Sequence, residues 1–434
     1  MTLLDLTPTR PHVATISHPV VIIGAGPVGL AAAAHLATRE IPFELFEAGD
    51  IADAVDRWGH TRLFSPWRYL VDPVAVELLE TTSWAMPPAD IAPTGTELRE
   101  AYLRPLAELP QLATHLHTGA RVTGVSRQGM DRTRTRGRAA APFVLRVQRG
   151  DREETVLASA VIDASGTFDQ PSPLASDGLP LRGADDIGDA LVGPLPDVLG
   201  SDRHRFEGRR VSVVGAGHSA ANTLLALVAL ADEAPATRIA WVIRNADAVR
   251  VSSSSDDELP DRAALGRRLD AHIAAGRIDV VDRFETDAVR RVDGGIELIG
   301  RSGPVSSVHA TDVVVASTGF RPDLGMLREL RLDFDEIVEA PRRLAPLIDP
   351  NVHSCGTVEP HGFRELAHPE EHFFVVGMKS YGRAPTFLLA TGYEQVRSVV
   401  AAITGDLEAA SHVQLELPAT GVCSTGGVGE GCCG

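Results

Sequence analysis

An apolar segment near the start of the chain runs directly into closely spaced glycines. Residues 20–29 read VVIIGAGPVG, a G-x-G-x-x-G pattern followed by an alanine-rich segment typical of a helix. The first glycine permits a tight turn, the second lets a pyrophosphate approach the backbone, and the third allows the helix to pack on the strand. The helix N-terminus also favours negative charge. We therefore expect the phosphates of a dinucleotide to bind at Gly24, Ala25, Gly26, Pro27 and Gly29.

An acidic residue follows the next apolar segment. Residues 43–46 read FELF, which is typical of a buried strand, and Glu47 comes next. A carboxylate roughly 20 residues past such glycines accepts hydrogen bonds from both hydroxyls of a ribose, which favours FAD or NAD over NADP. The alternative is a glycine-rich turn of an unrelated α/β protein, in which Glu47 is only solvated.

A second glycine turn occurs in the middle of the chain. Residues 210–220 read RVSVVGAGHSA, the G-x-G-x-x-A variant of the same pattern. The next predicted strand, 239–243, is followed by Arg244 in place of an acid. A guanidinium at this position suits the 2′-phosphate of NADP through paired hydrogen bonds, so NADPH is favoured over NADH. The predicted NADPH-binding residues here are Gly215, Gly217, His218, Ser219, Ala220 and Arg244.

A simpler interpretation of the second turn stays open. Arg244 is then an ordinary surface arginine in a domain that takes NADH or has lost its ligand. His218 lies inside the turn, and we expect it to contact phosphate or ribose only, because a single histidine is no evidence for proton transfer until a proton-transfer partner is identified.

The four cysteines do not form a disulfide framework. Cys423, Cys432 and Cys433 lie in the last dozen residues, whereas Cys355 is expected to be a small buried residue. The Cα atoms of adjacent cysteines are about 3.8 Å apart, below the usual disulfide range of about 4.4 to 6.8 Å, so a bond within the pair would be strained. The three terminal thiols instead suit a soft metal or metalloid such as trivalent arsenic, or a disulfide to Cys423. The alternative is a flexible end whose thiols do nothing.

Composition narrows the classes of partner. The chain has 434 residues, of which 44% are hydrophobic and 23% charged, so it falls in the globular range. A net charge of −17 argues against nucleic acid or an anionic membrane and favours a small-molecule substrate. Residues 1–19 lack the pattern of a signal peptide, and we expect a cytoplasmic enzyme, with a homodimer left open. Arginine replaces lysine almost everywhere, Lys379 being the only lysine, and we interpret this as codon bias.

Strand and helix patterns alternate around both glycine turns. They predict an α/β fold with two Rossmann-like dinucleotide-binding domains, the NADPH domain being inserted in the FAD domain. A stretch rich in proline, glycine and serine marks the crossing between them. The predicted boundaries are 16–170 for the first part of the FAD-binding domain, 171–204 for a linker, 205–310 for the NADPH-binding domain, 311–410 for the second part of the FAD-binding domain and 411–434 for a flexible, cysteine-containing tail.

These motifs, in this order, resemble the flavin-containing monooxygenase and disulfide-reductase superfamily. The resemblance includes Thr318 and Gly319 at the end of VVVASTGF and a late apolar strand that ends at Gly377, and it covers nearly the whole chain except the tail. It implies FAD at the first turn and NADPH at the second. It also implies that Thr318 and Gly319 mark the return from the NADPH domain, where we count them as NADPH-binding. Gly377, with the following Met378 to Arg383, is implied to lie near the ribityl-phosphate part of FAD.

A narrower resemblance is to the flavin-binding monooxygenases of bacterial arsenic-resistance operons. Three segments carry it, RWGHTRLFSPW (57–67), DASGTF (163–168) and GAGHSAAN (215–222). It implies that Trp58 and its neighbours as far as Ser65 lie against the isoalloxazine, and that the segment from Ala164 to Gly166 lines FAD. The alternative for the aromatic segment is simple core packing.

Two departures from these families bear on the reaction. The F-x-G-x-x-x-H fingerprint of Baeyer–Villiger and related monooxygenases begins at Phe206, but Ser212 stands where histidine is expected. No C-x-x-C or C-x-x-x-x-C pair lies beside either glycine turn, which excludes a conventional thioredoxin or glutathione reductase.

Three functions remain open at this point. The leading one has NADPH reduce FAD, after which one atom of oxygen passes to a soft nucleophile containing sulfur, nitrogen or trivalent arsenic. The second is a reductase that passes the electrons to the C-terminal cysteines and on to a disulfide or thiol-bound metal. The third is a metalloid-binding module or sensor with a structural FAD, against which the two intact turns argue. Catalytic residues stay unassigned, because binding and orientation suffice for the cofactor chemistry.

Overall fold

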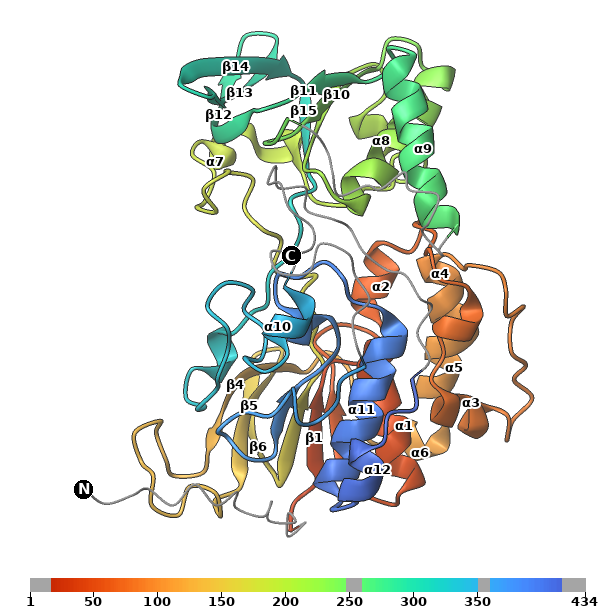
Figure 1. Cartoon of the computed structure of the whole chain (residues 1–434), viewed down its shortest axis with the longest axis vertical. Coiled ribbons are helices and arrows are strands. Elements are labelled where there is room, and N and C mark those ends of the chain that lie inside the picture. Colours follow the sequence, from red (N-terminus) through yellow and green to blue (C-terminus); the bar gives the residue numbers. More distant parts are fainter. Residues whose placement is uncertain (1–16, 247–259, 350–359, 416–434) are drawn as a thin grey trace, which may run out of the picture.

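The computed structural model describes residues 17–246, 260–349 and 360–415. They form two bodies stacked along the long axis in Figure 1, and the lower one contains residues from both early and late parts of the chain. The predicted α/β fold with two dinucleotide-binding domains is confirmed by the two parallel five-stranded sheets, one in each body. No helix within the described ranges combines the length and apolar character needed to cross a bilayer.

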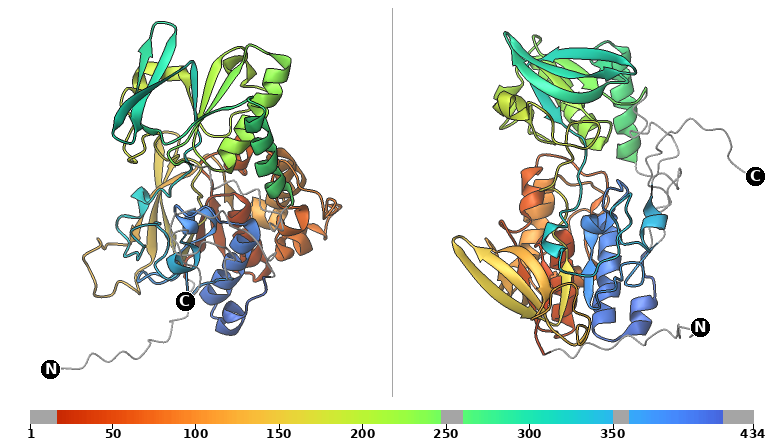
Figure 2. Two further views of the ribbon diagram at one scale, coloured as in Figure 1. Left: turned by 45° about the horizontal axis from the view of Figure 1, so that its top comes forward. Right: turned by 90° about the vertical axis from the view of Figure 1, so that its left-hand side faces the viewer.

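The lower body is built on a parallel sheet of order β16-β7-β1-β2-β3. Its strands are β1 (Val20–Ile23), β2 (Phe43–Phe46), β3 (Leu116–His117), β7 (Ala160–Asp163) and β16 (Phe373–Val375). Helices α1 (Pro27–Thr38) and α11 (Leu389–Ile403) cover one face, and an antiparallel sheet covers the other (Figure 2). That sheet contains β4 (Arg121–Arg127), β5 (Phe143–Arg149) and β6 (Arg152–Ala158).

Side-chain alternation along β1 shows why this sheet is covered on both faces. Val20 and Ile22 lie in one apolar cluster with the helices, whereas Val21 and Ile23 lie in another with β4 and β5. Successive side chains of a strand point to opposite faces, so an unbroken run of Val and Ile requires burial on both. The continuous apolar pattern of residues 20–23 therefore predicted a central parallel strand correctly.

The upper body repeats this plan with a parallel sheet of order β11-β10-β9-β15-β8. Its strands are β8 (Leu191–Val192), β9 (Arg210–Val214), β10 (Arg238–Val242), β11 (Asp279–Val281) and β15 (Val313–Ala316). Helices α8 (His218–Glu233) and α9 (Pro260–Ala274) lie beside it, and the antiparallel strands are β12 (Glu285–Val292), β13 (Gly295–Ser302) and β14 (Val305–Thr311). The shorter helices are α2 (Asp53–Arg57), α3 (Pro73–Leu79), α4 (Gly95–Leu98), α5 (Arg104–Ala107), α6 (Pro110–Ala113), α7 (Ala184–Ile187), α10 (Ala345–Ile348), α12 (Leu407–Ser411) and the 3₁₀ segment η6 (Gly377–Tyr381).

The strand pairing corrects the boundaries expected at 204 and 311. Strand β15 pairs with β9 on one side and with β8 on the other, so both belong to the upper sheet, although β8 was expected in a linker and β15 in the FAD-binding domain. The chain crosses between the bodies at two antiparallel segments, which meet where Pro171 pairs with Phe320. Proline- and glycine-rich composition misplaced the boundary, because β8 is too short to show a period.

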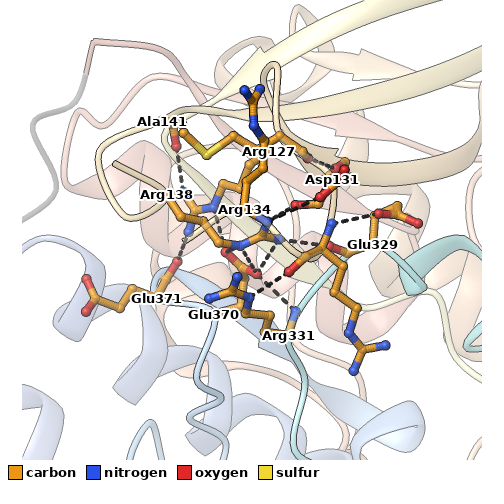
Figure 3. Close-up of polar contacts among 12 residues, drawn as sticks. Arg127, Asp131, Arg134, Arg138, Ala141, Glu329, Arg331, Glu370 and Glu371 are labelled. Atoms are coloured by element: carbon orange, nitrogen blue, oxygen red, sulfur yellow. Dashed lines mark hydrogen bonds and ion pairs between the residues drawn. The ribbon is translucent and has the colours of Figure 1, made fainter. Parts of the chain in front are cut away.

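A buried ionic cluster joins the loop after β4 to the segment before β16 (Figure 3). The Glu370 carboxylate accepts from Arg127 Nε at 2.8 Å and from Arg138 Nη2 at 2.8 Å. It also accepts from the backbone N–H of Arg331 at 3.0 Å. Burial alone would raise the pKa of Glu370, but the hydrogen bonds from Arg138, Arg331 and Arg127 outweigh it and hold that pKa below its usual value. One carboxylate thus compensates two buried guanidinium groups.

Replacing this carboxylate tests the cluster. Glu370→Gln should lower the free energy of unfolding at pH 7 by about 3–5 kcal/mol, because two buried cations lose their partner. A carboxylate with a lowered pKa stabilises the fold above its unfolded pKa, near 4.3, and loses that contribution as the pH falls through its folded pKa. Urea unfolding should therefore show the difference from the unmodified protein narrowing below about pH 4. Glu371→Gln, at the exposed neighbour, is the control, and equal losses in both variants would contradict the prediction.

Candidate dinucleotide-binding sites

The first glycine turn leaves the carboxyl end of β1 and enters α1. Gly24 has φ +98, in the left-handed region, and a side chain there would meet the carbonyl oxygen of Ala164 at 2.8 Å. A Cβ on Gly29 would lie 1.8 Å from the carbonyl oxygen of Gly24, so the helix could not approach the strand. Gly26 caps α1, and a Cβ there would meet no atom within 4 Å. The open space at Gly26, together with the helix N-terminus that follows at Pro27, fits a pyrophosphate group.

Glu47 folds back onto this turn from the end of β2. Its Oε2 accepts from the backbone N–H of Ala25 at 2.7 Å, and its Oε1 from that of Gly49 at 2.8 Å. Burial raises the pKa of the Glu47 carboxyl, against the lowering effect of these two hydrogen bonds. The carboxylate predicted to bind a ribose therefore also fixes the peptide between the first two glycines.

Residues from two other strands complete the edge of this site. Ala164 and Gly166 follow β7, and Gly377 follows β16, the two strands lying on the same side of β1 in the sheet. Gly377 has φ +68, and a Cβ there would meet the Val28 side chain of α1 at 3.1 Å. Segments that are far apart in the sequence thus meet at one sheet edge, because carboxyl ends of parallel strands share it.

The aromatic segment lies farther along. Trp58 ends α2, and its indole ring packs against Gly95, where a Cβ would lie 2.7 Å from the ring. Ser65 is half-buried and follows Phe64, whose ring lies 5.2 Å from that of His218 in the upper body. Core packing therefore accounts for one side of Trp58, and Ser65 lies at the junction between the bodies.

The second glycine turn repeats the construction of the first. Gly215 has φ +132, and a Cβ there would lie 2.0 Å from the carbonyl oxygen of Ser317, at the end of β15. Gly217 caps α8, with open space where its Cβ would be, and His218 and Ser219 form the first turn of that helix. Ala220 is fully buried, as the third position of the motif requires. The Trp241 indole N–H donates to the carbonyl oxygen of Gly215 at 2.6 Å.

Arg244 lies just beyond β10 and is exposed. Its Nη1 donates to the carbonyl oxygen of Ser176 at 3.2 Å. The side chain lines a hollow of about 480 Å³ together with Arg301 and several carboxylates, including Glu285. Within this hollow, Arg301 is paired with Glu285 at 3.0 Å.

Thr318 and Gly319 belong to the crossing between the bodies. The Thr318 hydroxyl donates to the carbonyl oxygen of Ser172 at 2.7 Å, and the backbone N–H of Ser172 donates to the carbonyl oxygen of Gly319 at 2.8 Å. These residues hold the two crossing segments together, so their polar groups have partners within the protein.

Sequence reasoning missed a buried cluster under the first turn. The Lys379 ammonium donates to Asp163 Oδ2 at 2.7 Å and to Ser165 Oγ at 3.0 Å. Two signals were available. The resemblance placed residues 378–383 near the flavin, and Lys379 is the sole lysine, which codon bias explains equally well. Neither signal indicated the ion pair with Asp163. Phe64 lies in the aromatic segment that the resemblance placed at the flavin, but its contact with His218 had no sequence signal.

The cysteine predictions lie outside the described residues. This applies to Cys355 and to the predicted metalloid or thiol site at Cys423, Cys432 and Cys433. Within the described ranges there is no group of three metal-ligating side chains.

Comparison with known proteins identifies the family. A family model described as pyridine nucleotide-disulphide oxidoreductase matches residues 21–355. A ferredoxin–NADP reductase of Gluconacetobacter diazotrophicus is 28% identical over 326 residues, covering 74% of this chain and 77% of that protein. The chain is therefore an oxidoreductase, and its cofactors are FAD and NADPH.

Solved structures share the fold at low identity. A bacillithiol disulfide reductase of Bacillus cereus superposes with TM-score 0.65 at 19% identity, over 90% of this chain and 99% of that one. An FAD-bound cadaverine monooxygenase of desferrioxamine biosynthesis from Erwinia amylovora gives TM-score 0.65 at 14% identity, over 96% and 100%. With the family match spanning most of both bodies, the chain belongs to the pyridine nucleotide-disulphide oxidoreductase family.

Proposed function

We propose that FAD binds at the first glycine turn and NADPH at the second, and that the enzyme is a flavin monooxygenase acting on a small soft nucleophile. The observation that carries the assignment is the duplicated turn: a strand, a glycine pressed against a neighbouring carbonyl, and a helix capped by an open glycine. At the first turn we assign the Glu47 carboxylate to the ribose of FAD. At the second turn we assign the Arg244 guanidinium to the 2′-phosphate of NADPH. An acid suits free ribose hydroxyls and a guanidinium suits a 2′-phosphate.

The arrangement of the bodies supports electron transfer between the two sites. The ring of His218, the first residue of α8, lies 5.2 Å from Phe64 of the lower body, so the second turn lies at the junction. FAD held at the first turn would supply the redox chemistry, as the acceptor of a hydride from NADPH. The protein binds both nucleotides, orients them across the junction and keeps water from the reacting atoms.

The acceptor decides between two reactions. In the sequence, no C-x-x-C or C-x-x-x-x-C pair lies beside either turn, which favours oxygen transfer to a diffusible substrate with sulfur, nitrogen or trivalent arsenic at its reactive centre. The second candidate is a reductase, favoured by the terminal cysteines Cys423, Cys432 and Cys433 and by the disulphide chemistry in the family description. A metalloid-binding module that turns over poorly is the third, and two complete turns speak against it.

Two glycines of the first turn separate folding from FAD binding. Gly29→Ala should destabilise the protein without FAD by about 1–3 kcal/mol or more, because the new methyl group collides with the backbone of Gly24. Gly26→Ala should cost less than about 1 kcal/mol in stability, yet weaken FAD binding at least about tenfold, since its Cβ occupies pyrophosphate space. Thermal unfolding and flavin titration measure the two effects. An unchanged FAD affinity in Gly26→Ala would contradict the proposal that FAD binds at this turn.

Arg244→Ala tests the 2′-phosphate assignment. Loss of charge-assisted hydrogen bonds worth about 1.5–3 kcal/mol should raise the KM for NADPH roughly 10- to 150-fold and leave the KM for NADH nearly unchanged. Steady-state flavin reduction with each nucleotide measures this. Arg238→Ala, at the opposite end of β10, is the matched control and should alter neither value. An equal rise in the KM values for NADPH and NADH would contradict the assignment of Arg244 to the 2′-phosphate.

The acceptor is tested by stoichiometry. A monooxygenase should consume one O₂ and one NADPH for each arsenite or organic sulfide oxygenated, with water as the other product. Oxygen-electrode traces and product analysis by mass spectrometry measure this ratio. Anaerobic oxidation of NADPH by a disulfide, lost in the Cys432→Ser/Cys433→Ser variant, would instead establish the reductase. Slow flavin reduction with tight arsenite binding would point to the module.

A further inference from the structure

The only lysine of the chain is wholly buried. The side chains of Lys379 and Asp163 are both 0% exposed, and their charged atoms lie 2.7 Å apart. Taking both charges out of water is costly, and replacing such a pair by apolar side chains is often neutral for stability or favourable. An ion pair at this position therefore needs a reason other than the stability of the fold.

A third side chain closes the cluster. The Ser165 hydroxyl donates to Asp163 Oδ1 at 2.7 Å and accepts from Lys379 Nζ at 3.0 Å. The backbone N–H of Ser165 also donates to Asp163 Oδ1, at 3.1 Å. The short turn after β7 is thus held by its own aspartate, which is in turn fixed and neutralised by Lys379.

This turn forms the wall of the first glycine turn. Asp163 is paired with Ile23 of β1 and with Val375 of β16, so it lies between the ends of two strands. A Cβ on Gly24 would lie 2.8 Å from the carbonyl oxygen of Ala164 and 2.9 Å from the Cα of Ser165. Any shift of residues 163–166 would therefore be passed directly to Gly24 and to the peptides after it.

The second glycine turn provides an internal comparison. The turn after β15 forms the wall of the second glycine turn. Ala316 is the equivalent of Asp163, because Ala316 pairs with Val214 of β9 just as Asp163 pairs with Ile23 of β1. Gly319 has φ +90 where Gly166 has φ +70, so the backbones match without a buried ion pair at the second site. A turn of this shape can therefore form without buried charges. The cluster of Lys379, Asp163 and Ser165 must then serve a function that the first site has and the second site lacks.

We propose that Lys379 is a positioning residue of the FAD site, acting through Asp163 and Ser165. It fixes the 163–166 wall against Gly24, and it cancels a carboxylate that would otherwise lie uncompensated beside the pyrophosphate turn. A rigid, neutral wall lowers the ordering cost of binding, which suits a cofactor that stays bound, whereas NADPH must exchange in every turnover. The inference rests on the proposed placement of FAD at the first turn.

The test compares two buried ion pairs at the two ends of β16. Lys379 follows this strand and Glu370 precedes it, so Lys379→Met and Glu370→Gln each leave buried charge unpaired, the first beside the glycine turn and the second away from it. The protein without FAD is titrated with FAD, the Kd is read from flavin fluorescence, and thermal unfolding is recorded for each variant. Lys379→Met should raise the Kd at least about tenfold, and Glu370→Gln should leave it unchanged at a similar loss of Tm.

The double variant Asp163→Asn/Lys379→Met tests the charge. It should recover most of the lost affinity, because the amide still accepts from Ser165 and no charge is left unpaired. A double variant as weak as Lys379→Met would overturn the charge argument. If Lys379→Met does not fold, Lys379→Arg decides: a raised Kd at unchanged Tm supports the fit to Asp163 and Ser165, and an unchanged Kd overturns it.

The outcomes separate this inference from the proposed function. Tight FAD binding by the unmodified protein with equal Kd values for Lys379→Met and Glu370→Gln would reduce Lys379 to a structural role and leave the FAD site intact. Weak or absent FAD binding by the unmodified protein, or normal affinity in Gly26→Ala, would overturn the site itself and the role of Lys379 with it.

Discussion

The close approach of backbone to backbone at the two glycine turns is the constraint on which the rest of the structure depends. At Gly24 and again at Gly215, the carbonyl of the neighbouring parallel strand occupies the place where any side chain would begin. Each contact fixes the register of two strands and the entry of the following helix at once. The sites that we propose for the two dinucleotides lie at the carboxyl edges of the two sheets, because the helix N-terminus and the strand ends meet there.

Two buried ionic clusters lie at opposite ends of β16. At one end of β16, Glu370 compensates two arginines and joins the loop after β4 to the sheet. At the other end, Lys379 and Asp163 lie beneath the nucleotide turn. Buried ion pairs of this kind add little net stability. They do restrict the surrounding side chains to one arrangement, because any other arrangement would leave an unpaired charge in apolar surroundings. At the Lys379 end, a fixed geometry suits the FAD site that we propose there.

Much of the fold could be predicted from local pattern. The unbroken apolar runs before Gly24 and Gly215 indicated buried parallel strands, and the glycine spacing indicated a tight turn into a helix after each of them. The domain boundaries could not be predicted as well, because β8 has only two residues and β15 precedes a motif that is typical of the return to the other domain. Which sheet a strand joins depends on its pairing with distant strands, and a short stretch of sequence does not show that pairing.

The sequence by itself determined the two glycine turns, the cofactors and the superfamily, since the turns depend on glycine spacing and the resemblance depends on the order of the motifs. Only the tertiary structure decided which side chains support the turns. Lys379 and Asp163 are 216 residues apart and carry no common pattern, yet adjacent parallel strands bring them into contact. Phe64 and His218 meet across the junction of the bodies, again without any shared sequence signal. Contacts of this kind follow from strand order and domain packing, which depend on the whole chain.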